Sequence, residues 1–329
     1  MAAIRPESHH LSHLRYNFTV KAQNGTPSSV GAFRKLLDAF AGEIPHVEEG
    51  DIEALHRMRV ASRRLRELIP LLALDADTTR RLSRRLRRVT RRLGSVRELD
   101  VLMLLIEELE GNARYPREGL KRIGAAVLRA RTAARERMAA KLPTPKLERL
   151  ARKLENAAKR LESRHTKSAS PTRANRPKNT WQWALDARLT RRAERAHAAI
   201  EAAGAVYLPE PLHAVRVALK KLRYTAELRT QTKRGRVTAE IKAMKTAQDL
   251  LGRLHDLEVL ISWTRDAQAS LFPPDLATWR ELDALVRALD DDCRVLHAGY
   301  VHDRARLIAI ADRLRATKPH TLHVQQVAS

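Results

Sequence analysis

The sequence predicts an all-α protein made of two tandem-related helical units, and three observations lead to this prediction. Apolar residues recur three and four positions apart along most of the chain, which is the pattern of amphipathic helices. No segment shows the sustained two-residue alternation of a half-buried strand. Two motifs each occur twice, with copies 157 or 158 positions apart. Such a repeat favours two helical bundles related by a pseudo-twofold axis.

The first unit, residues 28–162, is expected to contain helices separated by glycine, proline and capping residues. Asp51 is expected to cap the helix that follows it. Gly94 is expected to end a helix, and the capping box from Ser95 to Glu98 is expected to start the next one. The expected helices cover about residues 28–42, 51–72, 77–94, 95–105, 116–142 and 146–161.

The boundary between the units is expected at residues 163–179, which are rich in Ser, Thr, Asn, Pro and basic residues, as linkers are. The second unit, residues 180–316, resumes the helical pattern. Residues 1–27 and 317–329 are expected to form an N-terminal extension and a C-terminal tail. The histidines of the extension lack acid or cysteine partners, so a polar tail is favoured over a metal site. The expected helices of the second unit cover about residues 181–203, 210–230, 236–251, 254–269, 276–290 and 292–315.

The composition is that of a folded and strongly basic protein. The chain has 329 residues, of which 43% are hydrophobic, enough for two domains with a sizeable core. Its net charge of +25 implies a polyanionic partner: nucleic acid, an anionic membrane or a phosphate polymer. Aromatic residues make up only 4%, which argues against stacking of nucleic-acid bases.

The chain shows no sign of secretion or of a membrane span. Its single cysteine, Cys293, excludes an internal disulfide framework and fits a reducing compartment. The longest aliphatic run, from Val101 to Ile106, is too short to cross a bilayer. The N-terminus lacks the apolar segment of a secretory signal. We therefore expect a cytoplasmic protein.

The first repeated motif places a row of basic residues beside an apolar stripe on one helix. His56, Arg59, Arg63 and Arg66 follow helical spacing, one residue after the apolar positions. The row contains no acid, although solvated helix faces usually mix charges. The second copy, 157 positions on, carries His213, Arg216, Lys220 and Arg223. Two basic helices that merely face solvent are the alternative interpretation.

The second repeated motif covers residues 93–102 and 251–260. It carries Arg97 in the first copy and His255 in the second. Further basic residues match between the copies around these segments. Arg84 and Arg87 correspond to Lys242 and Lys245, and Arg34 lies opposite Arg191.

The paired H-x-x-R-V-A-x-[RK]-[RK]-L-R and L-G-x-x-[RH]-[DE]-L-[DE]-V-L stretches resemble the conserved histidine α-helical domain, the CHAD family, over about residues 28–316. This resemblance implies two up-down four-helix-bundle units around a basic central channel. It implies binding of inorganic polyphosphate and association with polyphosphate or polyhydroxyalkanoate granules. Some relatives add a triphosphate-tunnel (CYTH) domain, but this chain lacks the E-x-E-x-K motif, so phosphatase activity is not implied.

The resemblance also assigns the residues that would face the ligand. By this assignment, the polyphosphate-binding set is His56, Arg59, Arg63, Arg66, Arg84, Arg87, Arg97, His213, Arg216, Lys220, Arg223, Lys242, Lys245 and His255, with Arg34 and Arg191 more weakly. Lysine replaces arginine at several positions of the second copy, which puts equal affinity of the two halves in doubt.

Elementary chemistry agrees with an anion site. The arginine guanidinium offers a planar fork of donors that matches phosphate oxygens and stays charged when partly buried. The two motif histidines lie among arginines, so their pKa values are expected below about 6.5.

Catalysis and cofactors have little support in the sequence. The motif acids are Glu98, Asp100, Asp256 and Glu258. They could hold Mg²⁺, although ion pairs that hold arginines in place are favoured. No nucleophilic triad, P-loop or zinc spacing is present. We expect a protein that is not an enzyme and has no cofactor. A nucleic-acid-binding protein and a metal-dependent phosphohydrolase are the alternatives.

Overall fold

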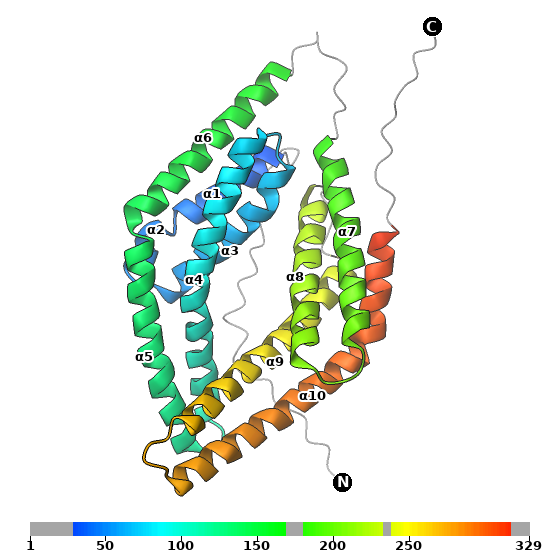
Figure 1. The fold of residues 1–329 in the computed structure, drawn as a ribbon. Helices are drawn as coiled ribbons and strands as arrows, with labels where there is room; N and C mark the ends of the chain where they lie inside the picture. Colours follow the sequence, from blue (N-terminus) through cyan, green and yellow to red (C-terminus); the bar gives the residue numbers. More distant parts are fainter. Residues whose placement is uncertain (1–28, 169–179, 233–237, 317–329) are drawn as a thin grey trace.

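The computed structural model describes residues 29–168, 180–232 and 238–316 (Figure 1). The predicted N-terminal extension, the C-terminal tail and residues 169–179 of the predicted linker lie outside the described residues. Within the described ranges the secondary structure is helical and contains no strand, which confirms the all-α prediction. No helix in these ranges is long and apolar enough to cross a membrane.

The helices of the first half form one arm of the molecule. They are α1 (Ser29–Ala41), α2 (Ile44–Glu48), α3 (Ile52–Leu68), the short 3-10 helix η2 (Ile69–Leu71), α4 (Ala76–Glu110), α5 (Arg117–Lys141) and α6 (Thr144–Ser168). Asp51 caps α3 as predicted, because its side chain accepts a hydrogen bond from the Glu53 N–H. Helix α2 was not predicted: Pro45 lies in its first turn, where a missing N–H costs nothing.

The second half forms the other arm, and it consists of four long helices. They are α7 (Thr180–Ala203), α8 (Pro209–Thr232), α9 (Ala239–Ala269) and α10 (Leu276–Arg315). Helix α10 packs against α9 and α7, in the way that α5 packs against α4 and α6 against α1. It stays a prediction that the two units are four-helix bundles and that a pseudo-twofold axis relates them around a central channel.

Several predicted breaks between helices are wrong. Helix α4 runs unbroken through Gly94 and the expected capping box, where the Ser95 hydroxyl bonds to the Arg92 carbonyl instead of capping a new helix. Helix α9 likewise continues through Gly252. Helix α10 passes through the expected break near residue 291. Helix α6 extends to Ser168, six residues into the predicted linker.

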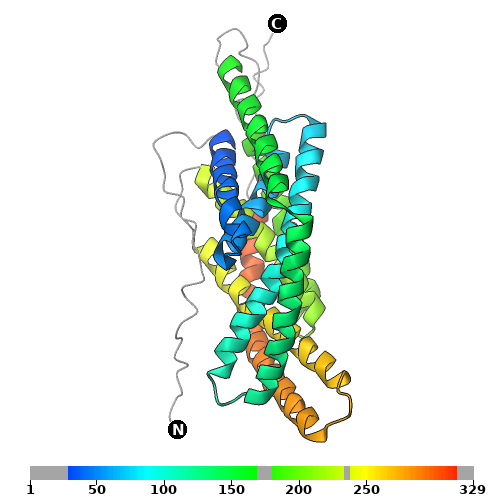
Figure 2. The same ribbon diagram turned by 90° about the vertical axis from the view of Figure 1, so that its left-hand side faces the viewer.

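The core consists of three buried apolar clusters, one within each arm and one that joins the arms. The first lies within α1–α4 and α6 and includes Phe33, Met58 and Leu86. The second lies within α7–α10 and includes Val215 and Met244. The third joins the arms, because the end of α4 and the first half of α5 pack against the end of α9 and the first half of α10. The arms diverge from this shared core (Figure 1), and they lie one behind the other when viewed from the side of the first arm (Figure 2).

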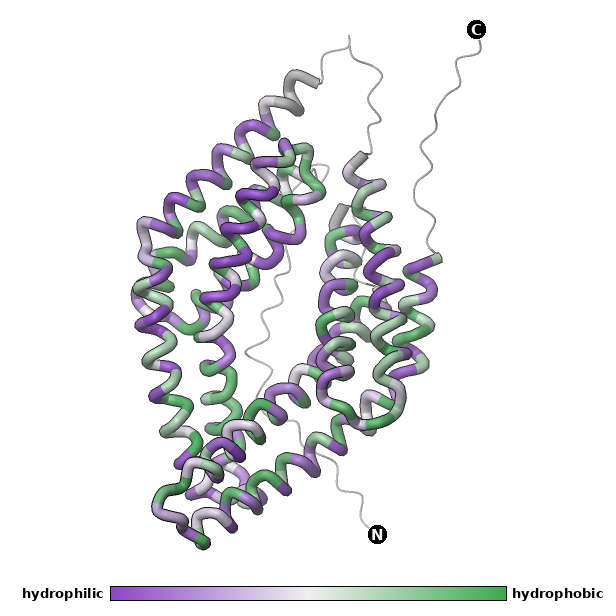
Figure 3. The backbone as a smooth tube through the Cα atoms, in the orientation of Figure 1, coloured by the Kyte–Doolittle hydropathy of each residue, from purple (hydrophilic) through white to green (hydrophobic). Residues whose placement is uncertain are grey.

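Polar residues of the two arms face each other above the shared core. Hydrophilic stretches of α3 and α4 lie toward the hydrophilic stretches of α7 and α8 (Figure 3). The repeated basic rows are on α3 and α8, so the fold brings the two copies of the motif to the same region between the arms.

Candidate functional site

The basic row of α3 is positioned by the burial of its apolar neighbours. Leu55, Met58 and Leu65 are buried in the core of the first arm. The adjacent stripe, which carries His56, Arg59, Arg63 and Arg66, is therefore only half-buried. Arg63 reaches across to the second arm, where its Nη2 donates to the hydroxyl of Tyr224 on α8 at 2.7 Å.

The basic row of α8 meets the row of α3. Lys220 is half-buried, and the nearest charges are Arg63, Arg216, Arg59 and Arg223, two from each arm. Burial and these four positive charges lower the pKa of the Lys220 amine to about 6. The structure thus brings the two predicted rows together, as the duplicated motif indicated.

The cluster contains buried hydrogen-bond donors that have no partner within the described residues. They are the Nε atoms of Arg59, Arg63 and Arg216 and the Nη1 atom of Arg97. Burying a charged donor without a hydrogen-bond partner costs free energy, and native proteins rarely contain such a donor. An arrangement of this kind is typical of a site that an anion completes.

A glycine lies beneath the same arginine of each row. A Cβ added to Gly94 on α4 would lie 3.5 Å from Nε of Arg59, and one added to Gly252 on α9 would lie 3.6 Å from Nε of Arg216. Each guanidinium therefore packs directly on the backbone of the neighbouring helix. A Cβ at either position would make ordinary contact with the guanidinium, so the space above each glycine is taken by the arginine of the neighbouring helix.

The motif histidines differ between the arms. Burial, together with Arg97, Arg59 and other nearby arginines, lowers the pKa of His56 to about 4. His213 is exposed, and its ring lies 4.6 Å from the ring of His255. Partial burial and the neighbouring His255 and Arg216 also lower the pKa of His213. Both shifts have the predicted direction, but only His56 lies deep among arginines.

The remaining predicted residues lie farther from the centre or are engaged by acids. Arg34 forms ion pairs with Glu155 at 2.7 Å and Glu162 at 3.0 Å, and these two acids raise its pKa. Arg66 lies near Arg63 and Arg87. The more peripheral residues are Arg84, Arg87, Lys242 and Arg191, which are exposed, and Lys245, which is half-buried.

The motif acids lie at the site's edge. Asp100 is buried and accepts from Arg131 Nε at 2.7 Å, so it fixes an arginine of α5. Glu258 accepts from the hydroxyl of Tyr207 at 3.1 Å. Burial raises the pKa of Asp256, against the lowering effect of Arg216. Across the described parts of the chain, no group of three or more His, Cys, Asp or Glu residues could hold a metal ion.

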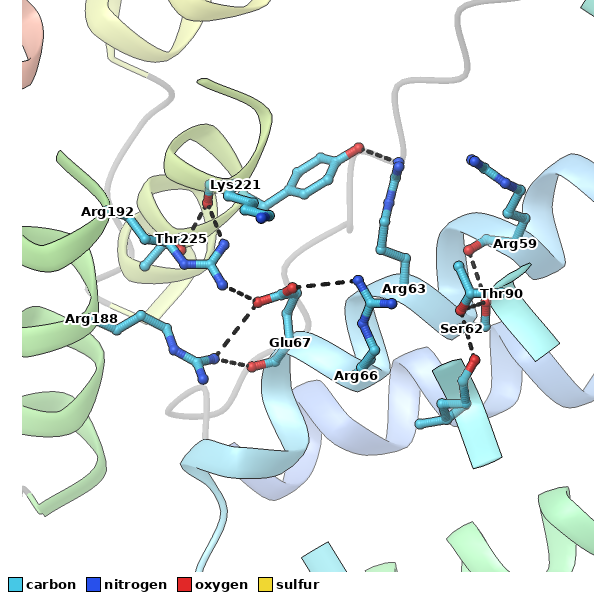
Figure 4. Close-up of polar contacts among 12 residues, drawn as sticks. Arg59, Ser62, Arg63, Arg66, Glu67, Thr90, Arg188, Arg192, Lys221 and Thr225 are labelled. Carbon is cyan, nitrogen blue, oxygen red and sulfur yellow. Dashed lines mark hydrogen bonds and ion pairs between the residues drawn. The ribbon is translucent and has the colours of Figure 1, made fainter. Parts of the chain in front are cut away.

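Sequence reasoning missed a set of residues that tie the arms together (Figure 4). Glu67, directly after the α3 row, binds Arg192 and Arg188 of α7. Tyr224, directly after the α8 row, lies against guanidiniums of both arms, with Arg223 at 4.7 Å and Arg63 at 5.1 Å from its ring centroid. Glu67 and Tyr224 occupy equivalent positions of the repeat, and this shared position was the available signal.

Comparison with protein families decides the relationship. The family model of the CHAD domain matches residues 31–265, most of the chain. The chain belongs to the CHAD domain family. CHAD domains are associated with polyphosphate binding.

Solved structures show the same fold. The crystal structure of the CHAD domain from the plant Ricinus communis is 22% identical, with a TM-score of 0.54 over 88% of this chain and 91% of that chain. PptA from Streptomyces chartreusis is 20% identical, with a TM-score of 0.54 over 87% of this chain and 98% of that chain. A search of curated proteins finds no match.

Proposed function

We propose that this CHAD protein binds inorganic polyphosphate along the two basic rows that meet between its arms. The observation that carries this proposal is the group of buried, unpartnered guanidinium nitrogens on Arg59, Arg63 and Arg216, with the amine of Lys220 among them. Like charges held this close repel one another, and a bound polyanion would remove the repulsion.

The chemistry of the rows suits a linear phosphate polymer. Successive arginines one helical turn apart present donor forks at regular intervals, and each polyphosphate unit carries a charge and acceptor oxygens. Tyr224 is the aromatic ring between the two rows, and guanidiniums of Arg63, Arg64 and Arg223 already surround it. This favours recognition of phosphate over stacking of bases.

We further propose that the protein binds without catalysing hydrolysis. Asp100 and Glu258 are engaged by Arg131 and Tyr207, Asp256 is half-buried beside Arg216, and Glu98 is an exposed acid near Arg59. Incubated with long-chain polyphosphate and Mg²⁺ or Mn²⁺, the protein should release no phosphate. Turnover that disappears in Asp100→Asn or Glu258→Gln would instead identify a metal-dependent phosphohydrolase.

A polyphosphate-binding protein would gather where the polymer is stored. We therefore propose a cytoplasmic location at polyphosphate granules, or at polyhydroxyalkanoate granules that carry polyphosphate. A fluorescent fusion should move with the granules and become diffuse in cells that cannot make the polymer.

The deciding experiment is a competition between polyphosphate, duplex DNA and RNA at equal total charge and fixed salt. Preference for polyphosphate by at least about tenfold would support the proposal, because nonspecific attraction depends on charge alone. Equal competition by all three polymers would overturn it in favour of a general polyanion-binding or nucleic-acid-binding protein.

A further inference from the structure

The basic row of α3 ends at a carboxylate that already occupies a basic cluster. Glu67 follows Arg66 directly, and its side chain forms ion pairs with Arg192 and with Arg188, the latter at 3.8 Å (Figure 4). Arg66 Nη2 lies 3.9 Å from the other carboxylate oxygen. One negative charge therefore faces three guanidiniums.

This cluster is partly shielded from solvent. The side chains of Glu67, Arg188 and Arg192 are 21%, 20% and 14% exposed. Burial and the neighbouring Arg192 lower the pKa of Arg188, although Glu67 opposes this change. A single carboxylate thus leaves the positive charge of the three arginines incompletely balanced.

The cluster is continuous with the proposed polyphosphate site. Arg66 lies close enough to Arg63 and to Arg192 for both to lower its pKa. The positive surface therefore passes from α3 of the first arm to α7 of the second, and Glu67 lies at this crossing, whereas Glu227 of α8 pairs with Arg64 and Arg223. Arg192 and Arg188 are held in place independently of the carboxylate, since they also donate to the backbone carbonyls of Lys221 and Glu67.

A carboxylate resembles one interior unit of a polyphosphate chain. Each presents one negative charge and two terminal oxygens to the guanidinium forks. Glu67 is a single side chain at the end of a helix, so a rotation of its side chain would vacate the cluster while the backbone contacts of Arg188 and Arg192 remain.

We propose that Glu67 acts as an internal substitute for a phosphate unit and that long polyphosphate chains displace it to reach Arg66, Arg188 and Arg192. This inference rests on the proposed function. Short chains occupy the rows as far as Arg63, and longer chains also gain Arg66, Arg188 and Arg192 at the cost of moving one carboxylate. Glu67 is therefore a residue that sets chain-length preference.

The test compares tripolyphosphate with long-chain polyphosphate in Glu67→Gln, which keeps the size and one acceptor oxygen but removes the charge. Glu110→Gln is the matched control, since Glu110 is exposed at the far end of α4 and the substitution changes the net charge equally. Affinities are measured by calorimetry at fixed salt on variants whose helical content matches the wild type. The ratio of long-chain to tripolyphosphate affinity should rise about tenfold in Glu67→Gln, equivalent to about 1.4 kcal/mol, and remain at the wild-type value in Glu110→Gln.

A second variant tests the arginines themselves. Arg188→Gln with Arg192→Gln should lower the same ratio about tenfold. An unchanged ratio in both variants would overturn the inference, as would an equal loss of both ligands in Glu67→Gln, which would identify a purely structural tie. If Glu67→Gln does not fold, the arginine variant decides alone.

The outcomes separate this inference from the proposed function. Wild-type protein that binds neither ligand would overturn the proposed function itself. Wild-type binding with no change of ratio in either variant would overturn only the role of Glu67.

Discussion

Within the basic rows, the amine of Lys220 has the pKa that lies farthest from its ordinary value. Its pKa falls to about 6 from an ordinary value near 10.5, because it is half-buried among four arginines. The motif histidines were expected to have lowered pKa values, and His56 confirms that direction. Because its pKa is lowered to about 4, however, the His56 imidazole is neutral at physiological pH. Lys220, with a pKa of about 6, changes its charge close to physiological pH.

We predict that polyphosphate affinity rises about tenfold as pH falls from 8 to 6. In the free protein Lys220 is mostly neutral at pH 8, whereas a bound polyanion favours the charged amine and raises its pKa. Binding therefore takes up a proton, and lower pH favours it. Lys220→Arg should bind better than wild type at pH 8 and show a flatter profile. A wild-type slope in this variant would assign the pH dependence elsewhere.

The stability of the unliganded protein should change with pH in the opposite direction. A base whose pKa is lowered by folding is harder to charge in the folded state, so the folded state loses stability as pH falls from about 10.5 through about 6. Thermal unfolding without ligand should show a midpoint that rises between pH 6 and pH 9 more in wild type than in Lys220→Met. A midpoint that falls over this interval equally in both would contradict the assigned pKa.

We predict that Arg59→Ala with Arg216→Ala weakens polyphosphate binding far more than Arg149→Ala with Arg152→Ala. Each half-buried guanidinium contributes about 1.5–3 kcal/mol through charge-assisted hydrogen bonds. Arg149 and Arg152 are exposed on α6, so they act only through a field that salt screens. Titration at constant salt measures both pairs, which change the net charge equally. Equal losses would show that total charge, not a site, controls binding.

Helices α4 and α9 show why glycine within a repeated motif is not always a helix end. Gly94 and Gly252 were expected to terminate helices, yet both helices continue, and a guanidinium of the adjacent helix lies over each glycine. A Cβ would make only ordinary contact there, whereas a larger side chain would have to take the space of the guanidinium. The sequence pattern alone cannot distinguish the two uses of glycine.

We predict that Gly94→Leu with Gly252→Leu weakens polyphosphate binding without altering charge. The added Cβ atoms lie only 3.5 and 3.6 Å from the guanidiniums of Arg59 and Arg216, so the remaining atoms of each leucine must displace them. Gly94→Ala with Gly252→Ala is the control, because those distances are ordinary contacts and alanine favours the helix. Loss of binding in the alanine pair as well would point to an effect of helix geometry.

The elements differ in how far the sequence could predict them. The helical class, the two basic rows and their approach to one another follow from spacing and duplication, since buried apolar stripes orient the neighbouring residues. The contacts of Glu67, Tyr224 and Arg192 depend on the angle between the arms, which no local pattern encodes. Arg34 had the right spacing, but Glu155 and Glu162 on α6, more than 120 residues away, engage it.

The shared core gives the whole molecule its cohesion. Ile106 and Leu120 of the first half pack in the same cluster as Leu260 and Leu285 of the second, and all four are almost fully buried. Separating the halves would expose this surface on both sides. The rows are consequently held at a fixed distance by a core that neither half can complete alone.

We predict that residues 29–168 and 180–315, produced as separate chains, aggregate when expressed singly and form a one-to-one complex when expressed together. Exposed apolar surface of this extent favours association. Size-exclusion chromatography with light scattering measures the masses. Two monomeric, cooperatively folded halves would show that the shared core is not needed for folding.

Glu67 and Tyr224 make the two ends of the basic site different, although they occupy equivalent positions of the repeat. Two identical chains about a two-fold axis would carry the same residue at both places. A duplication within one chain removes this restriction, and here one copy has a carboxylate that reaches Arg192 while the other has a phenol that reaches Arg63. An inorganic phosphate chain reads the same from either end. The ligand therefore has no polarity, whereas the binding site has two different ends. The asymmetry of the site alone sets the end at which a bound chain can extend beyond the rows.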